Sequence, residues 1–302
     1  MSKRTLALIA ASFVAIFYGA NFTIAKDVMP HYIQPFGFIV LRVLGTMLLF
    51  WAISFLGPKE KIAPKDFKRI TAAAFFGVAL NMLAFFEGLN LTTPISASVL
   101  MITAPIIVLI LSVIFLKEKA SIIKIIGVLT GLSGALLIIL YGKGNSLTAS
   151  NPTLGNFLVF VNAASYACYI IVVKKITQKY HPFTFMKWMY TIGFFMVLPF
   201  GYEQITQMQP AHIPLDGYLK IGYVILFATF GTYVLNIFAI RELKPTTVAV
   251  FIYLQPLLAS IFAIALGSDH LDSIKIVAAI IIFTGVYLVT KPTAQNKKKI
   301  NS

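Results

Sequence analysis

Residues 94–116 read PISASVLMITAPIIVLILSVIFL, and residues 245–266 read PTTVAVFIYLQPLLASIFAIAL. Neither stretch contains a charged residue. Each is long enough to cross the roughly 30 Å hydrocarbon core of a bilayer as a single helix, which takes about 20 residues. The two stretches align without a gap at a shift of 151 residues, which superimposes both pairs of prolines. The chain therefore contains an apolar, membrane-spanning pattern that occurs twice.

The composition of the whole chain is that of a membrane protein. Of its 302 residues, 59% are hydrophobic and 12% are charged, and the mean hydropathy is +0.87. Soluble domains carry about 25% charged residues, so this chain lacks the polar surface that a water-soluble globule needs. The single cysteine, Cys168, excludes an internal disulfide and a cysteine-built metal centre. Lipid is therefore the predicted solvent for most of the chain.

Ten apolar stretches are predicted to cross the membrane as helices. They use most of the chain and leave room for short connections but not for a soluble domain. The predicted spans are residues 5–25, 34–56, 70–89, 94–116, 122–140, 153–173, 183–200, 218–240, 245–266 and 272–290. The predicted fold class is all-α integral membrane protein with ten transmembrane helices.

The basic residues orient these spans. With the N-terminus inside, the inner segments hold 20 lysines and arginines and the outer segments hold three. Such a bias is typical of cytoplasmic loops, so both termini are predicted to be cytoplasmic, in a bacterial inner (plasma) membrane. Because the net charge of +15 lies in clusters between spans, the expected partners are membrane lipid and a small-molecule solute. Nucleic acid is not an expected partner, and the chain is expected to be a monomer or a homodimer.

The 151-residue shift divides the chain into two repeats. The predicted domains are a first repeat of five helices over 1–140, an external connector over 141–152, a second repeat over 153–290 and a basic cytoplasmic tail over 291–302. Five spans are an odd number, so the second repeat enters the membrane from the opposite side. Inverted repeats of this kind build many secondary transporters and place a site near the membrane midplane.

A family resemblance lies in the same stretches. Residues 88–98 (GLNLTTPISAS), Ala104-Pro105, residues 115–119 (FLKEK), Gly127 and Gly134 resemble the EamA domain of the drug/metabolite transporter superfamily. The second half repeats the pattern more loosely in residues 243–249, Gln255-Pro256 and Gly285, and it departs from it at Ser268-Asp269-His270. The resemblance covers about residues 5–290 and implies a ten-helix, two-repeat carrier, frequently an exporter of amino acids or related metabolites.

Two ionisable residues inside the predicted spans stand out, Arg42 and Glu87. A charge within the bilayer is costly, so each is a candidate functional residue. Arg42 also lies where the family often has an arginine in its second span. Two readings stay open: an ion pair between Arg42 and Glu87, with a structural or coupling role, or an Arg42 that faces a central cavity and receives a substrate carboxylate.

Polar side chains inside the spans predict a cavity for a small polar solute. Asn162, Tyr166 and Tyr169 share one helix face, as do Tyr18 and Asn21, and neither face is favourable against lipid. Hydrogen bonding between helices is the competing reading, and it is the favoured one for Asn81 and Asn236. The predicted substrate-binding residues are Tyr18, Asn21, Arg42, Thr103, Asn162, Tyr166, Tyr169, Tyr253 and Gln255.

Pro105 and Pro256 are predicted to break the fourth and ninth spans at matching places. Proline removes a backbone donor and frees a carbonyl group, and Thr103 and Gln255 precede these breaks closely. Paired interruptions in two repeats indicate a transporter site, whereas ordinary proline kinks are the alternative. Gly127, Gly131 and Gly134 give the fifth span a small-residue face, which is predicted to pack within the bundle.

These patterns predict a secondary transporter that moves a small polar or zwitterionic, amino-acid-like metabolite by alternating access. The resemblance to the EamA domain implies the direction of export. A passive channel or facilitator and a multidrug/proton antiporter are the alternatives. The antiporter is less favoured because Glu87 is the only acidic residue in the interior of a span, since Asp272 is the first residue of the tenth. An enzyme is not expected, because all four histidines fall in predicted connectors. No cofactor and no metal is expected.

Overall fold

The computed structural model of the chain describes residues 2–29, 32–55, 57–58, 60–91, 100–117, 121–141, 151–265 and 273–290. Most of the predicted connector 141–152 and the basic tail 291–302 lie outside these ranges. The described residues form helices joined by short turns and contain no strand. The predicted all-α class is therefore confirmed.

The first part of the chain contains α1 (Lys3–Val28), α2 (Pro35–Ser54), α3 (Pro64–Ala74), the π-helical turn η1 (Phe75–Ala79), α4 (Leu80–Leu91), α6 (Thr103–Leu116) and α7 (Ile122–Tyr141). The second part contains α8 (Pro152–Thr177), α9 (Pro182–Thr206), the 3₁₀ turn η2 (Pro210–His212), α10 (Leu215–Ile225), the π-helical turn η3 (Leu226–Gly231), α11 (Thr232–Glu242), α12 (Pro245–Val250), the 3₁₀ turn η4 (Phe251–Tyr253), α13 (Leu254–Ala265) and α14 (Ser273–Thr290).

A helical segment lies at each of the ten predicted spans. In the described residues, six helices are long and apolar enough to cross a membrane, and they correspond to the first, second, third, sixth, seventh and eighth predicted spans. The other four segments are apolar but shorter, 10–17 residues within the described ranges. The membrane-spanning character is thus confirmed for six helices, and ten crossings stay a prediction.

The helix boundaries follow from local chemistry. Proline is the first residue of α2, α3, α8, α9 and α12, where its missing N–H has no helical partner to lose. The side chains of Ser2 and Asn151 cap α1 and α8 by accepting backbone N–H groups of the first turn. α6 ends where Lys117 adopts the left-handed conformation, with φ of 53°.

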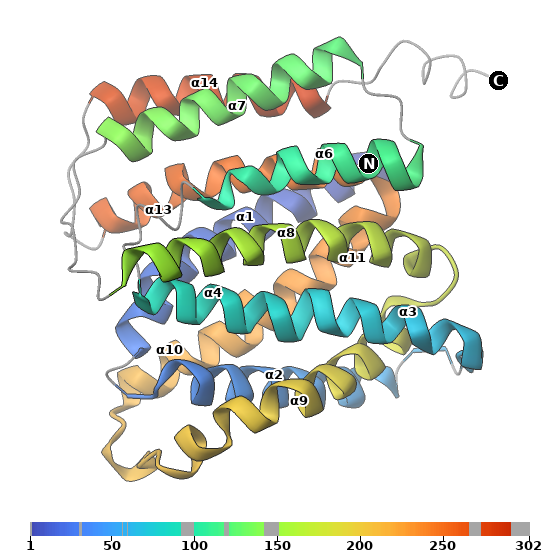
Figure 1. The fold of residues 1–302 in the computed structure, drawn as a ribbon, viewed down its shortest axis with the longest axis vertical. Coiled ribbons are helices and arrows are strands. Elements are labelled where there is room, and N and C mark those ends of the chain that lie inside the picture. The colour runs from blue at the N-terminus through green and yellow to red at the C-terminus, as the bar shows by residue number, and fades with distance from the viewer. Residues whose placement is uncertain are drawn as a thin grey trace.

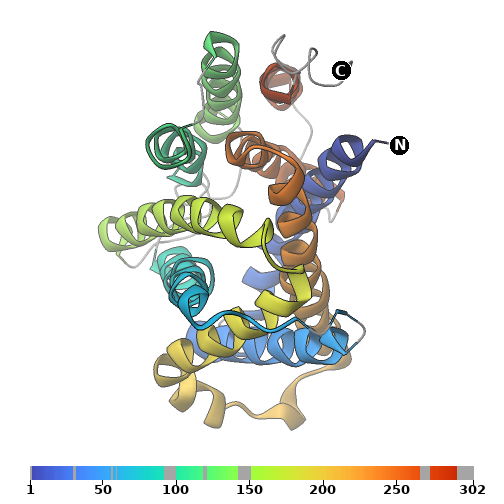
Figure 2. The same cartoon turned by 90° about the vertical axis from the view of Figure 1, so that its right-hand side faces the viewer.

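The helices run across the longest axis of the molecule (Figure 1). α7 and α14 lie together at one end of this axis, and α2 and α9 lie together at the other (Figures 1 and 2). Between them, α1 packs on α11 and α13, while α8 packs on α4 and α6. Each of these packed pairs joins a helix from the first part of the chain to one from the second, so the two parts interlock.

The first and last described helices meet where α1 begins and α14 ends. This end of the bundle is formed by helix termini and is not an end of the longest axis (Figure 1). The guanidinium of Arg4, at the start of α1, donates to the carbonyl oxygen of Thr290, the last residue of α14. The chain therefore enters and leaves the helical bundle on the same side.

Two π-helical turns interrupt the α-helices at corresponding places. η1 and η3 begin 151 residues apart, at the shift that also superimposes the proline pairs. η1 packs against α8 and α9, and η3 packs against α1 and α2. π-helical turns are rare and frequently lie at functional sites, so the region between η1 and η3 is a candidate functional site.

Close packing of α7 on α14 depends on glycine. A Cβ atom placed on Gly285 would lie 2.5 Å from the backbone nitrogen of Gly131 and 2.8 Å from the carbonyl oxygen of Gly127. Gly134 lies against Ile281 and Ala278 of the same partner helix. The predicted small-residue face of Gly127, Gly131 and Gly134 therefore packs within the bundle.

Substitution of Gly285 by alanine is expected to lower the thermal stability of the chain in detergent, by about 1–3 kcal/mol, because backbone atoms of α7 must move away. The matched control is Gly222→Ala in α10, where no atom of the described residues lies within 4 Å of an added Cβ, apart from its chain neighbours and its own helix backbone. That change should raise stability by about 0.5–1 kcal/mol, since alanine favours a helix over glycine. Thermal unfolding curves of both variants check the two signs, and equal shifts would contradict the packing argument.

Candidate functional site

A cavity of about 90 Å³ lies between helices from both parts of the chain. Its volume corresponds to several water molecules. The walls come from α1, α2, α4, α8, α11, α12 and the segment around η4, together with Met101. The lining residues are Ala11, Val14, Ala15, Tyr18, Asn21, Arg42, Asn81, Met82, Phe85, Phe86, Met101, Asn162, Tyr166, Tyr233, Asn236, Val248, Phe251, Ile252 and Gln255.

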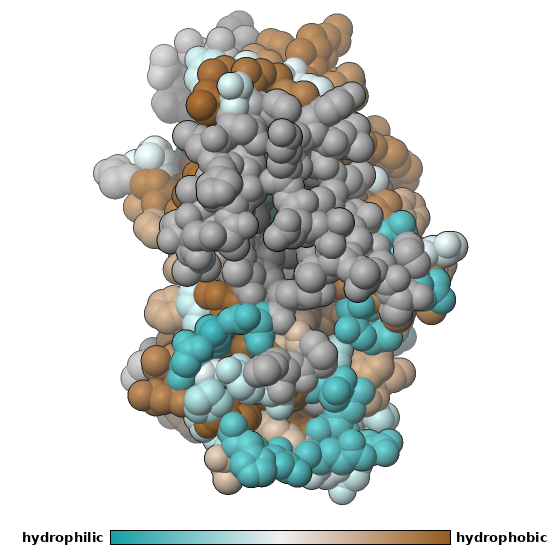
Figure 3. All heavy atoms as spheres, turned by 90° about the vertical axis from the view of Figure 1, so that its left-hand side faces the viewer, coloured by the Kyte–Doolittle hydropathy of each residue, from teal (hydrophilic) through white to brown (hydrophobic). Residues whose placement is uncertain are grey.

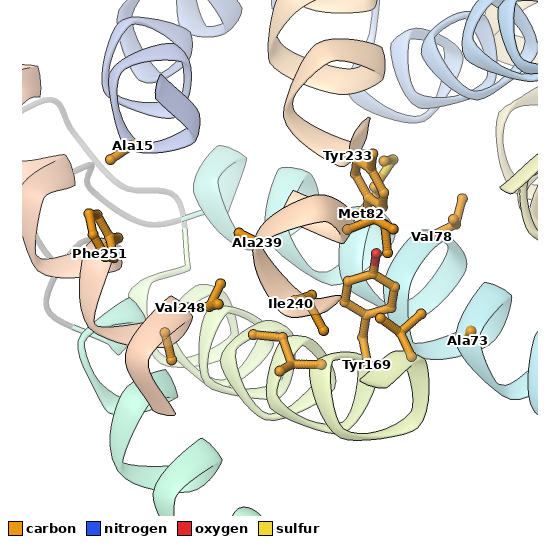
Figure 4. Packing of buried hydrophobic residues seen from close by; sticks show 14 of the residues in the cluster. Ala15, Ala73, Val78, Met82, Tyr169, Tyr233, Ala239, Ile240, Val248 and Phe251 are labelled. Carbon is orange, nitrogen blue, oxygen red and sulfur yellow. The ribbon is translucent and has the colours of Figure 1, made fainter. Parts of the chain in front are cut away.

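One face of α1 forms a wall of this cavity. Ala11, Ala15 and Tyr18 are spaced i, i+4 and i+7, and Asn21 continues the same face by one turn. The small side chains of Ala11 and Ala15 leave the space, and the two larger residues supply polar groups at one end of it. Figure 4 shows Ala15 and Phe251 on one side of the buried cluster, away from Tyr169 and Tyr233.

The structure brings six of the nine predicted substrate-binding residues to the cavity. They are Tyr18, Asn21, Arg42, Asn162, Tyr166 and Gln255. These six side chains come from α1, α2, α8 and α13, and Arg42, Asn21 and Asn162 are each no more than 5% exposed. Their position fits the predicted role, which stays a prediction.

Tyr169 and Tyr253 are placed elsewhere, since both pack as core residues. The Tyr169 ring lies on Gly77 of η1, and a Cβ added to Gly77 would stand 2.3 Å from it. The Tyr253 ring lies in the same way on Gly131 of α7, at 2.2 Å. Each tyrosine therefore fills the space over a glycine of a neighbouring helix, and neither is among the lining residues of the cavity. Figure 4 shows Tyr169 rising from α8 toward Met82 and Tyr233.

Thr103 is likewise not among the lining residues. It is the first residue of α6, and its hydroxyl donates to the carbonyl oxygen of Leu100 at 2.5 Å. The hydroxyl thus satisfies backbone at the start of the helix, in place of the cavity position that the sequence predicts.

Each predicted proline break lies at the start of a helix. A turn at Ile102 precedes α6, and η4 precedes α13, so Pro105 and Pro256 are both the third residue of their helices. In the first turn of a helix the backbone N–H has no helical partner, so proline is tolerated there. Both interruptions reach the cavity, the first through Met101 and the one at η4 through Phe251, Ile252 and Gln255.

Arg42 is held on two sides. Its Nε and Nη2 atoms donate to Thr229 Oγ1 of η3 at 3.1 and 2.9 Å. The guanidinium carbon also lies 4.5 Å from the centre of the Phe86 ring, a cation–π distance. Its Nη1 atom is buried and has no hydrogen-bond partner among the described residues.

The predicted ion pair between Arg42 and Glu87 is not present in the described structure. The guanidinium bonds to Thr229 instead. The physical reason is helical geometry. Phe86 faces Arg42, and the next residue of α4 is turned by about 100° around the helix axis. Glu87 is half-buried on that other face and is not among the lining residues.

Sequence reasoning missed Tyr233 and favoured a packing role for Asn81 and Asn236, yet all three line the cavity. Asn236 both packs between helices and lines the cavity. Its Nδ2 donates to the Tyr166 hydroxyl of α8 at 3.3 Å, while its Oδ1 is unpaired among the described residues. Tyr233 and Asn236 are spaced i, i+3 on one face of α11. This is the same spacing that identifies Tyr18 and Asn21, so the signal was available.

Four buried polar atoms in the cavity wall lack a partner among the described residues. They are Asn21 Oδ1, Arg42 Nη1, Asn162 Oδ1 and Asn236 Oδ1. More than about 90% of buried polar groups in proteins are hydrogen-bonded, so a cluster of exceptions indicates a place for a ligand or water. The residues of the cavity wall thus carry one cationic donor and three amide acceptors that no described protein group satisfies.

Ion pairs link the two parts of the chain at both ends of the bundle. At the end that carries Arg4, Lys179 donates to Asp66 of α3, and the Tyr180 hydroxyl donates to the same carboxylate at 2.7 Å. The Asp66 and Tyr180 contacts raise the pKa of Lys179, so its ammonium stays charged. At the opposite end, Lys220 of α10 bonds Asp27 at 2.5 Å. Figure 3 shows hydrophilic residues gathered on this opposite end.

Comparison with known proteins identifies the family. Residues 5–140 and 153–291 each match the EamA-like transporter family. An uncharacterized transporter of Archaeoglobus fulgidus is 27% identical over 291 residues, which cover 95% of this chain and 94% of that protein. The uncharacterized transporter YyaM of Bacillus subtilis is 21% identical over 90% of this chain and 89% of its own length. A WAT1-related protein of Arabidopsis thaliana is 24% identical over 93% of this chain and 81% of its length.

A known crystal structure has the same fold. It superposes with a TM-score of 0.76 at 14% sequence identity and covers 100% of both chains. The two family matches together span nearly the whole chain and fall on its two parts. With its apolar spanning helices, the protein is a membrane transporter, and the chain belongs to the EamA-like transporter family.

Proposed function

We propose that this chain is a secondary transporter that moves a small polar or zwitterionic metabolite, amino-acid-like in its groups, through the cavity between its two halves. The observation that carries the proposal is the cluster of unpaired buried atoms, Arg42 Nη1 and the three asparagine oxygens, around that cavity. A solute with both an acceptor and a donor group satisfies them, whereas an apolar molecule leaves them unpaired. Export is the direction that we propose.

The halves are proposed to be inverted repeats of five helices each, residues 1–140 and 153–290. The π-helical turns at the same 151-residue shift support this, as do the packing pairs. The equivalent helices are α1 and α8, α4 and α11, and α6 and α13. α1 packs on α11 and α13, and its equivalent α8 packs in the same way on α4 and α6. α2 pairs with its equivalent α9, and α7 with its equivalent α14. A twofold relation between the halves generates this pattern.

The end that carries Arg4, Asp66 and Lys179 is proposed to face the cytoplasm of a bacterial cell. The support is the distribution of Lys and Arg, 20 in the segments on this side and three in those on the other. The first and last helices share this end, which agrees with an even number of crossings.

Alternating access is favoured over a channel because the halves are linked at both ends. Asp66 and Lys220 belong to different halves, and each pairs with a residue of the other half. In an alternating-access cycle we expect the ion pair at the open end to break while the pair at the other end is kept. A proton-coupled cation antiporter is not supported, because no carboxylate is among the described lining residues.

The test is transport by the purified chain in sealed lipid vesicles, screened with radiolabelled amino acids and related metabolites. We expect uptake of at least one solute that saturates with concentration and is accelerated by unlabelled solute inside the vesicles. Both properties are typical of a carrier with alternating sites. Flux that rises linearly with concentration would indicate a channel, and no flux above protein-free vesicles would contradict the proposal.

A further inference from the structure

The Arg42 guanidinium is fixed in one orientation by a residue far away in the sequence. Thr229 Oγ1 accepts from both Nε and Nη2, at 3.1 and 2.9 Å, and the two residues are 187 positions apart. The Phe86 ring covers the guanidinium at 4.5 Å. With these contacts made, Nη1 is the guanidinium nitrogen that remains unpaired, and Arg42 is a lining residue of the cavity.

Thr229 can accept two hydrogen bonds because its own proton is used elsewhere. Its hydroxyl donates to the carbonyl oxygen of Val224, five residues back, at 2.7 Å. That reach matches the wide π-helical turn η3, in which the backbone hydrogen bonds shift from four to five residues. The oxygen lone pairs are therefore left for Arg42, and the π turn determines where the guanidinium is held.

Among the described residues, the charge of Arg42 has no counter-ion. Among the described lining residues none is acidic, and Glu87 makes no ion pair in the described structure. Thr229 and Phe86 stabilise the cation without neutralising it. A buried, uncompensated charge is unfavourable, and it is relieved when an anionic group enters the cavity.

The matching contact in the other half contains no charge. There η1 packs on α9 as η3 packs on α2, and the contact is apolar, with Val78 against Gly193. The fold thus forms this contact without a polar pair. The Arg42–Thr229 pair is therefore not required by the architecture, and its place at the cavity points to a ligand.

We propose that Arg42 Nη1 binds a carboxylate of the transported solute and that Thr229 is the positioning residue that holds the guanidinium for it. This inference rests on the proposed function and narrows it to carboxylate-bearing solutes. The amide oxygens of Asn21, Asn162 and Asn236 are the acceptors available to an ammonium group on the same molecule.

The experiment is chemical modification of the purified full-length chain in detergent with phenylglyoxal, which reacts with guanidinium groups. Mass spectrometry of the digested protein measures the reaction at Arg42 separately from Arg4, Arg69 and Arg241. The probes are an equimolar mixture of the protein L-amino acids without arginine, whose guanidinium would consume the reagent, and the matching mixture of their carboxamides. We expect the carboxylates to protect Arg42 and the carboxamides not to, with the other arginines unaffected by either.

Three variants test the positioning role. Thr229→Val should raise the amino-acid concentration for half-protection of Arg42 by about tenfold, because the guanidinium is no longer oriented. Thr229→Ser keeps the hydroxyl and should restore the original value. The matched control is Thr46→Val on α2, which removes a buried threonine hydroxyl that has no partner in the described structure. Its half-protection should equal that of the unchanged chain.

Equal protection by both mixtures, or none by the amino acids, would overturn the carboxylate assignment. Unchanged protection in Thr229→Val, or equal loss in Thr229→Ser, would overturn the positioning role. These failures are distinct from failure of the proposed function. If amino acids protect Arg42 but no flux is measured in vesicles, the carboxylate site is present and the proposed transport is wrong. If the flux of a solute does not depend on its carboxylate, the chain is a carrier and the carboxylate assignment is wrong.

Discussion

Replacement of Arg42 by methionine is expected to abolish solute movement and to raise the thermal stability of the chain. Transport should fall by about 100-fold or more, because the solute loses its partner in a buried site. Stability should rise by about 1–4 kcal/mol, because apolar residues of similar volume commonly outperform a buried charge. Methionine can lie on Phe86 in place of the guanidinium, and Thr229 keeps its bond to Val224.

The opposite signs make this prediction specific. Initial flux in vesicles and thermal unfolding in detergent are measured on the same preparation. Arg42→Lys is the companion variant, which keeps the charge but loses the paired hydrogen bonds to Thr229, and it should retain part of the flux. A fall in stability of Arg42→Met would show that Arg42 is a structural residue, and unchanged flux would remove it from the site.

Helix positions could be predicted from the sequence because lipid imposes a simple rule. A span needs about 20 apolar residues, so stretches such as 94–116 can be identified from hydropathy alone. Membrane crossing by each of them is harder to establish, since part of the fourth stretch lies outside the described residues and α6 is short. The all-helical class and six spanning helices follow from hydropathy, whereas the number of crossings does not.

The cavity was predictable only in part, because a helix face tells which side turns inward but not what it meets there. Asn162 and Tyr166 line the cavity, whereas Tyr169, on the same face, lies on a glycine of η1. That glycine is remote in sequence, and no pattern in α8 reveals it. The same holds for Tyr253 over Gly131.

The Arg42–Thr229 pair lay beyond sequence reasoning for two reasons. A π-helical turn leaves no mark in composition, since residues 226–231 read like any apolar helix. Hydroxyl groups are also unremarkable inside spans, so Thr229 gives no signal, while Glu87 stands out as the obvious partner for a cation. The position of a charge in the sequence predicted that Arg42 was important, but only tertiary contacts identified what holds it.

Substitution of Ala15 by tryptophan is expected to stop transport while leaving the fold intact. Ala15 is 1% exposed and forms the cavity wall on α1, where its small side chain leaves space for a solute. An indole at this position enters a cavity of about 90 Å³ that already exists, so it occupies the space that a solute would use. Flux of any solute through the cavity should fall to the level of protein-free vesicles.

The matched control is Phe13→Trp, two residues away on the same helix. Phe13 is 47% exposed, on the outer face of the bundle, so an indole there should leave flux and thermal unfolding unchanged. Binding provides a second readout, because protection of Arg42 from phenylglyoxal by amino acids should be lost in Ala15→Trp and kept in Phe13→Trp. If Ala15→Trp transports normally, the path of the solute does not pass through this cavity, and the site must be sought elsewhere between the two halves.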